Sequence, residues 1–248
     1  MTQRSSGLDR VRFRELCTAD ELAALCEFER RIWGDGDVVS LNMLVATVDE
    51  GGMAIGAYVP VDDASASAEP DDWLVGAVYG FPSREVGVLH SHYMAVDPTM
   101  RRAGLGVQLK HRQRDWCLAN GYTTMRWTYD PLQLANAHLN LRVLGAVGIS
   151  YHVDHYGRMG GLNGSLPSDR LTVQWSLVGQ NAVWSERAEI SVGPCTADDI
   201  ADSTDAARRV RMELRDEMAV LMHQGWVVID VDRQRRRYVL GRSAALCE

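Results

Sequence analysis

In the first half of the chain, the pattern of apolar and polar residues predicts alternating strands and helices. Thr18 and Glu21 stand three residues apart before a helical periodicity, and this capping-box pattern predicts a helix that ends near Trp33. The other elements expected here are strands at residues 11–16, 53–59, 73–81 and 86–96, and helices at residues 40–48 and 104–120. Residues 61–72 are small and acidic and are expected to form a hairpin loop.

The second half continues the alternation of strands and helices. The elements expected here are strands at residues 123–129, 149–156 and 171–178, helices at 133–144 and 205–223, and a hairpin with strands at 226–231 and 237–240. Residues 179–196 are interpreted as a connection. We therefore expect one domain at residues 1–178 and, at residues 179–248, a connection with a C-terminal α-β-β extension that packs on it.

Composition narrows the class of protein. With 248 residues, of which 46% are hydrophobic, the chain can bury a sizeable core. Its formal charge of −7 offers little attraction to nucleic acid or to an anionic membrane, so we expect neither as a partner. Its five cysteines form no CxxC pair, and no window reaches the roughly 18 apolar residues that a membrane span needs. With no signal-peptide pattern, we expect a cytoplasmic protein with free thiols.

The stretch HSHYMAVDPTMRRAGLG, residues 90–106, holds the candidate chemistry. A strand, a short turn and a helix that begins at Gly104 would direct several unpaired backbone N–H groups at one point. Gly104 and Gly106 lack the Cβ atoms that would keep a phosphate away, while Arg101 and Arg102 supply positive charge. The pattern predicts an anion site, although two glycines alone also fit a plain turn.

The order strand, Arg101-x-x-Gly104-x-Gly106, helix resembles the coenzyme-A pyrophosphate loop of the Gcn5-related N-acetyltransferase superfamily. The order of elements at residues 11–178 also resembles that superfamily. More narrowly, four segments and the tail resemble a bacterial subgroup of predicted acetyltransferases, some of them associated with N-succinylamino-acid metabolism. These segments are WTYDPLQ at residues 127–133, NAHLNL at 136–141, LGAV at 144–147 and GSLPSDR at 164–170.

The resemblance implies an α/β protein with the acyl-CoA N-acyltransferase fold, a mixed central sheet flanked by helices, extended by a C-terminal helix and β-hairpin. It also implies acetyl-CoA or another acyl-CoA, succinyl-CoA included, as the donor and a small-molecule amine as the acceptor. The backbone of Met94, Ala95 and Val96 would pair with the pantetheine arm. The pyrophosphate would lie on Arg101, Arg102, Ala103, Gly104, Leu105, Gly106 and Val107.

Two asparagines and two arginines are candidates for further contacts. The amides of Asn136 and Asn140 can hold the pantetheine amides or, equally, line a helix. If the acceptor carries a carboxylate, as an amino acid does, Arg170 or Arg142 could bind it through two hydrogen bonds. A structural ion pair fits either arginine as well. Residues 161–170 are expected to form a loop near the acceptor.

The motif His90-x-His92-x-x-Ala95-Val96 resembles that of serotonin N-acetyltransferase, in which two histidines relay the proton from the amine. Residues i and i+2 of a strand share a face, and an imidazole with a pKa near ~6.5 suits removal of a proton from an ammonium group. We favour His92 as the base and His90 as its relay partner. The competing interpretation is that both imidazoles pack on the sheet.

One position departs from the superfamily's pattern. Leu141 stands where the superfamily often has a tyrosine that protonates the departing thiolate, so Tyr129, Tyr151, Tyr156 or water would replace it. No spacing of His, Cys, Asp and Glu indicates a metal site, and we predict none. The main alternative function is an acyl-CoA sensor without turnover; a second is another thioester reaction, such as decarboxylation. The oligomeric state, a homodimer included, stays open.

Overall fold

The computed structural model describes residues 7–35, 38–60, 72–101, 103–157, 166–179 and 183–243. The chain divides after Thr123 into two units, residues 1–123 and 124–248, which are described in turn. Gly36, Arg102 and Cys247 lie outside the described residues, as do residues 61–71 and 161–165 of the two loops predicted at 61–72 and 161–170. Among the described helices, none combines the length and the hydropathy that crossing a membrane requires.

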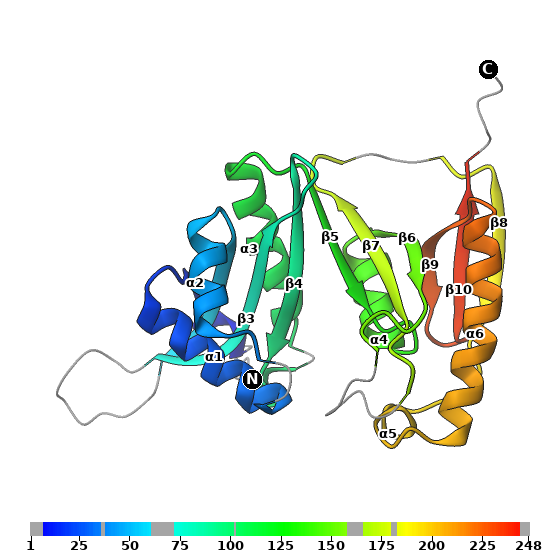
Figure 1. Ribbon diagram of the computed structural model, residues 1–248, viewed down its shortest axis with the longest axis horizontal. Helices are drawn as coiled ribbons and strands as arrows, with labels where there is room; N and C mark the ends of the chain where they lie inside the picture. Colours follow the sequence, from blue (N-terminus) through cyan, green and yellow to red (C-terminus); the bar gives the residue numbers. More distant parts are fainter. Residues whose placement is uncertain are drawn as a thin grey trace, which may run out of the picture. The chain divides into compact units, whose positions relative to one another are not determined.

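The first unit is an antiparallel sheet with helices on both faces (Figure 1). Its strands lie in the order β1-β2-β3-β4, and each pairs antiparallel with the next. The elements of this unit are η1 (Gly7–Arg10), β1 (Arg12–Glu15), α1 (Ala19–Trp33), α2 (Leu41–Asp49), β2 (Met53–Pro60), β3 (Asp72–Pro82), β4 (Val88–Val96), η3 (Pro98–Met100) and α3 (Leu105–Ala119).

The predicted capping box is present at the start of α1. The Thr18 hydroxyl accepts a hydrogen bond from the Glu21 N–H, and the Glu21 carboxylate accepts one from the Thr18 N–H at 3.0 Å. At the other end, Gly34 has a φ of 82°, a backbone conformation that favours glycine. Local sequence therefore determines both ends of this helix, as predicted.

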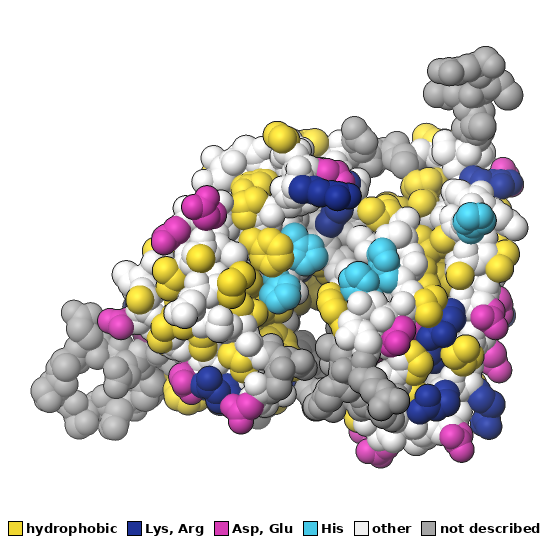
Figure 2. Space-filling view, in the orientation of Figure 1, with side chains coloured by type: hydrophobic (Ala, Val, Ile, Leu, Met, Phe, Trp, Pro, Cys, Tyr) yellow, Lys and Arg dark blue, Asp and Glu magenta, His cyan; other side chains and the backbone are white. Residues whose placement is uncertain are grey.

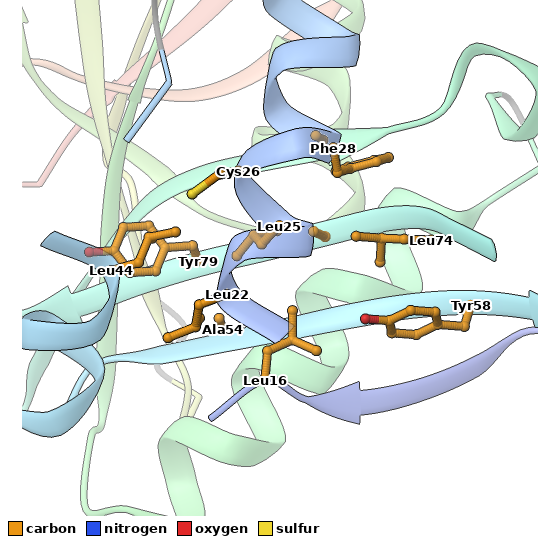
Figure 3. Packing of buried hydrophobic residues seen from close by; sticks show 12 residues of the cluster. Leu16, Leu22, Leu25, Cys26, Phe28, Leu44, Ala54, Tyr58, Leu74 and Tyr79 are labelled. Carbon is orange, nitrogen blue, oxygen red and sulfur yellow. The ribbon is translucent and has the colours of Figure 1, made fainter. Parts of the chain in front are cut away.

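The core of the first unit lies between α1, α2 and one face of the sheet. Leu22 and Leu25 of α1 and Leu44 of α2 are buried in one cluster with Tyr79 of β3 (Figure 3). The other face of β3 meets α3, because a Cβ atom at Gly76 would lie 3.1 Å from side-chain atoms of Leu105 and Leu109. Strand β4 thus has a face toward α1 and α2 and a face toward α3.

The second unit is also an antiparallel sheet, with strand order β5-β7-β6-β9-β10-β8. Its last three strands come from the C-terminal part of the chain, and helix α6 packs on β6 and β8 (Figure 1). The elements of this unit are β5 (Thr124–Tyr129), α4 (Leu134–Ala137), η4 (His138–Val143), β6 (Val147–His152), β7 (Arg170–Ser176), β8 (Glu186–Ser191), α5 (Ala197–Ala201), α6 (Asp205–His223), β9 (Val227–Asp232) and β10 (Arg237–Arg242).

One sequence prediction for the second unit was wrong, and another was confirmed only in part. The connection predicted at residues 179–196 contains a strand, β8, which pairs with β10 along its whole length. The single helix predicted at 133–144 is a short α-helix, α4, followed by a π-helix, η4. The predicted C-terminal helix at 205–223 and the hairpin after it are confirmed as α6, β9 and β10. A domain boundary after residue 178 stays a prediction.

Candidate functional site

The turn after β4 is held by Asp97. Its carboxylate accepts hydrogen bonds from the Thr99 N–H at 3.0 Å and from the Thr99 hydroxyl at 2.7 Å, which caps η3. Partial burial alone would raise the pKa of Asp97, but the Thr99 hydrogen bonds and the charges of Arg31 and Arg101 outweigh it and lower this pKa. At neutral pH the carboxylate is therefore charged and can accept both hydrogen bonds from Thr99.

Helix α3 begins at Gly104, which has a φ of 92° in the left-handed region. No side chain caps this end of the helix, so its first N–H groups depend on other acceptors. At Gly106 a Cβ atom would lie 3.3 Å from the Met94 Cε atom, so this glycine also lets α3 approach β4 closely. The uncapped, positive end of a fifteen-residue helix is a suitable place for an anion.

The loop that leads to this helix exposes Arg101. Its Nε atom donates to the Val96 carbonyl at 3.4 Å, and its side chain lies at the surface beside the turn. Ala103 is also exposed, whereas Leu105 is buried under the helix. Arg102 lies outside the described residues. A guanidinium beside the helix start can add its charge to that of the N–H groups.

Strand β4 contains a β-bulge at His92. Tyr79 of β3 pairs with Tyr93, and the next residue, Gly80, pairs with Ser91, so the register skips His92. Regular alternation would place Tyr93 on the same face as Ser91. The extra residue instead places His92 and Tyr93 together on the face toward α1, while Ser91 reaches α3.

The two histidines of β4 lie on one face, in a group of aromatic rings. The His90 and His92 ring centroids are 6.1 Å apart, and Phe81 of β3 contacts both, at 5.0 and 5.6 Å. Tyr79 and Tyr93 complete the ring contacts around His92. Histidine side chains are seen among hydrophobic side chains on the face shown in Figure 2. The structure therefore brings the two predicted imidazoles together.

Burial lowers the pKa of His92 below its ordinary value of 6.5. His92 is an exposed residue, but the rings of Tyr79 and Phe81 pack against it and disfavour the charged form of the imidazole. At pH 7 the imidazole is therefore neutral and can accept a proton. Neutrality at working pH is the first requirement for a general base.

A buried polar network touches β4 between the two histidines, on the opposite face. Lys110 of α3 donates to the Ser91 hydroxyl oxygen at 2.7 Å and to the Gln113 side-chain oxygen at 3.2 Å. Ser91 donates to the same Gln113 oxygen at 2.9 Å. Burial lowers the pKa of Lys110 to about 7. Sequence analysis missed this network, although Lys110 and Gln113 stand on the buried side of α3 with Leu109.

A second buried ionisable group lies near Tyr93, on the face toward α1. The Glu29 side chain is fully buried, and its Oε2 atom accepts a hydrogen bond from the Val39 N–H at 2.9 Å. The Glu29 carboxylate also interacts with the Tyr93 hydroxyl. Burial raises the pKa of Glu29, and burial together with the Glu29 charge raises that of Tyr93. Sequence analysis missed this pair too.

The remaining predicted site residues lie in the second unit and differ in how far their side chains are exposed to solvent. Asn136 is exposed on α4. Asn140 is buried, and its side-chain oxygen accepts a hydrogen bond from the Trp127 indole at 3.2 Å. Leu141 is buried as well. Asn136 thus has an amide at the surface and Asn140 has one held inside the protein, and a contact of either with pantetheine stays a prediction.

The two arginines considered for a carboxylate both have protein partners. Arg170 is the first residue of β7; it is buried, donates to the Asp169 carbonyl at 2.9 Å and stacks on the Tyr156 ring. Arg142 lies 3.6 Å from an Asp230 carboxylate oxygen. A role for either in acceptor binding stays a prediction.

The tyrosines considered as acids are also engaged. The Tyr129 hydroxyl donates to the Tyr238 hydroxyl at 3.4 Å, and the Tyr151 hydroxyl donates to Asp169 at 2.6 Å. Burial raises the pKa of both Tyr129 and Tyr151. The Tyr156 hydroxyl, which is exposed, lies 3.1 Å from the Thr128 hydroxyl. The described residues contain no group of three or more His, Cys, Asp or Glu side chains placed to hold a metal ion.

Comparisons with known proteins bear on the fold. Residues 51–146 match the family model of the acetyltransferase (GNAT) family, a range that holds β2 to β4, the loop at Gly104 and α3. No curated protein matches the chain. Solved structures do match the chain, and three of them, all from bacteria, are described next.

The ribosomal-protein-S18-alanine N-acetyltransferase from Escherichia coli is 16% identical, with a TM-score of 0.51 over 70% of this chain and 99% of its own. An acetyltransferase of the GNAT family from Streptococcus pneumoniae is 14% identical, with a TM-score of 0.51 over 67% of this chain and 98% of its own. A Salmonella typhimurium protein solved with acetyl-CoA is 16% identical, with a TM-score of 0.50 over 71% of this chain and 98% of its own. The chain therefore has the acyl-CoA N-acyltransferase fold, as the sequence predicted.

Proposed function

We propose that this chain, built on the acyl-CoA N-acyltransferase fold, transfers an acetyl or succinyl group from an acyl-CoA to the amine of a small molecule. One observation carries the proposal: a single strand, β4, places the His92 imidazole beside that of His90, and the short turn after this strand leads to the uncapped helix start at Gly104. The first feature suits an amine that must lose a proton, and the second suits a pyrophosphate. The shared fold supports this assignment.

The residues at the helix start fit the phosphate groups of coenzyme A. Gly104 precedes α3 in a left-handed conformation with no side-chain cap, and Arg101, three residues earlier, is exposed. The first N–H groups of α3 and Arg101 would hold the pyrophosphate, while the backbone of Met94 to Val96 would align the pantetheine arm. N–H groups of this segment that point away from β3 would stabilise the oxyanion.

The reaction needs a proton acceptor and no covalent enzyme intermediate. The amine nitrogen attacks the thioester carbonyl, the C–S bond breaks, and the coenzyme-A thiolate takes a proton from solvent. His92 would accept the proton that the amine loses, with His90 beside it to pass the proton on. Cys117 does not act as a nucleophile in this scheme, because it is fully buried and burial raises its pKa to about 12.

The second candidate function is an acyl-CoA sensor without turnover. It is favoured by Leu141, a buried apolar residue at a position where the superfamily often has a tyrosine that acts as the acid. A thiol is, however, a tolerable leaving group without such an acid. Acceptor identity, including an amino acid held by Arg170 or Arg142, is part of the proposal still to be tested.

A free-thiol assay separates the candidates. The purified protein is incubated with acetyl-CoA and succinyl-CoA in turn, with and without a mixture of primary amines and amino acids. We expect thiol release that depends on the amine. Binding without release would identify a sensor, and release without amine would identify another thioester reaction; either result overturns the transferase proposal.

A further inference from the structure

The network of Lys110, Ser91 and Gln113 has no part in the reaction proposed above. It joins two elements, since Lys110 and Gln113 belong to α3 and Ser91 belongs to β4. Gln113 extends it to β2 by donating to the Met53 sulfur at 3.4 Å. The Lys110 residue is 3% exposed, so its amino group is held among these partners rather than in water. Burial of a lysine costs free energy, whereas an apolar side chain could fill the same space without that cost. We therefore ask what the Lys110 amine does for the structure.

Ser91 stands between His90 and His92, next to the bulge. Across the sheet it pairs with Gly80, where a Cβ atom would lie 2.8 Å from the His90 carbonyl and 3.1 Å from the Gln113 amide nitrogen. The network therefore passes directly behind the bulge and needs a glycine opposite it. A side chain at this position would be too close to the His90 carbonyl and would crowd the Gln113 amide.

At the bulge β4 has one residue, His92, more than the facing part of β3. The strand could therefore also pair with β3 one residue out of its observed register. A shift of one residue exchanges the faces of every side chain in a strand. Such a shift in β4 would move Ser91 to the aromatic face and turn His92 toward α3. The hydrogen bond from Lys110 holds Ser91 on the α3 face, so it opposes this shift.

We propose that Lys110 is a positioning residue that acts through Ser91 to keep the His92 imidazole on the aromatic face of β4. The catalytic part of this inference rests on the proposed function, because it matters for turnover only if His92 is the base. The positional part does not, since the orientation of His92 can be measured without a substrate.

The test uses Lys110→Met, which keeps the side-chain volume and removes the donor, with Ser91→Ala and the double variant. Titration of the His92 ring by NMR is expected to show its pKa moving up toward the ordinary value in each variant, because the imidazole leaves the packed rings. We expect kcat with amines to fall by about 10-fold to 100-fold and the Kd for acetyl-CoA to stay unchanged. The double variant should be no worse than either single variant, since both remove the same contact.

Arg112→Met is the control, because Arg112 is exposed on the same helix and its guanidinium contacts the Phe13 ring of β1 instead of β4. It should leave both the His92 titration and kcat unchanged. An unchanged His92 titration in Lys110→Met overturns the inference. A moved titration in a protein that releases no thiol with any amine would keep the positional inference and overturn the proposed function instead.

Discussion

Arg211 and Asp130 are joined by two parallel hydrogen bonds of 2.7 Å, from the two terminal nitrogens of the guanidinium to the two carboxylate oxygens. The pair connects α6 to the residue that follows β5, and the Arg211 side chain is 1% exposed. Arg215, one helical turn on, binds Asp169 in the same two-point way. Helix α6 is thus tied to the rest of the second unit by two ion pairs with buried or largely buried side chains.

Arg211→Met should lower the free energy of unfolding by about 3–5 kcal/mol, because it leaves Asp130 as a buried charge without its partner. The measurement is urea-induced unfolding at pH 7. Arg237→Met is the control: Arg237 also pairs with a carboxylate, Glu189, at 2.8 Å, but both side chains are about half exposed. This pair should contribute about 1 kcal/mol or less. Equal losses in the two variants would contradict the assignment of Arg211 to the core.

Gly104→Val should weaken acetyl-CoA binding by about 10-fold to 100-fold, the equivalent of about 1.5–3 kcal/mol for one lost hydrogen bond to a charged group. The side chain strains a left-handed residue and displaces the helix start from the phosphate. Calorimetric titration measures the Kd.

Gly121→Val is the matched control, since Gly121 follows the other end of α3 with a φ of 81° and open space around it. It should cost a similar amount of stability, about 1–2 kcal/mol, without changing the Kd. An unchanged Kd in Gly104→Val would remove the loop from the site.

Lys110→Met should stabilise the protein at pH 6. The pKa of this lysine falls from 10.5 to about 7 on folding, so between these values the unfolded chain binds more protons and stability rises with pH. Below pH 7 the full free-energy cost of burying the charged Lys110 amine is present, about 5 kcal/mol at 1.36 kcal/mol per pKa unit. The hydrogen bonds to Ser91 and Gln113 offset part of this cost. Urea unfolding at pH 6 and pH 10 should show a gain that shrinks at the higher pH. A gain independent of pH would contradict the burial of a titrating amine.

Local signals explain what the sequence could predict. The capping box at Thr18 and the glycines after α1 and α3 set helix ends through contacts within a few residues, so those helices lie where expected. Strand β8 carries no such signal, because its charged side chains pair with β10 and only Ile190 is buried. The helix predicted at 133–144 is present, but its π-helical part, η4, was not predicted; within it Asn140 accepts a hydrogen bond from Trp127, thirteen residues away.

In the candidate site, too, some features follow from local sequence and others depend on contacts between distant residues. The loop at Gly104 and the shared face of His90 and His92 follow from spacing along the chain. The bulge at His92 depends on the register between β3 and β4, which no local pattern encodes. The sequence gives one indication of Lys110, because a charged residue stands on the apolar stripe of α3. Its contact with Ser91 could not be predicted without the three-dimensional structure.

The pH dependence of kcat/KM should identify the base. Because burial lowers the pKa of His92, the ascending limb is expected at an apparent pKa below the ordinary 6.5. His92→Gln should remove this limb or move it upward and lower kcat/KM by about 100-fold or more, with the Kd for acetyl-CoA unchanged, because the pyrophosphate loop begins beyond Val96. His90→Gln serves as the comparison: a relay partner should reduce the rate less and leave the limb in place. If both single variants and the double variant keep near-normal activity and the same limb, the imidazoles are packing residues, and the amine loses its proton to water or to another group.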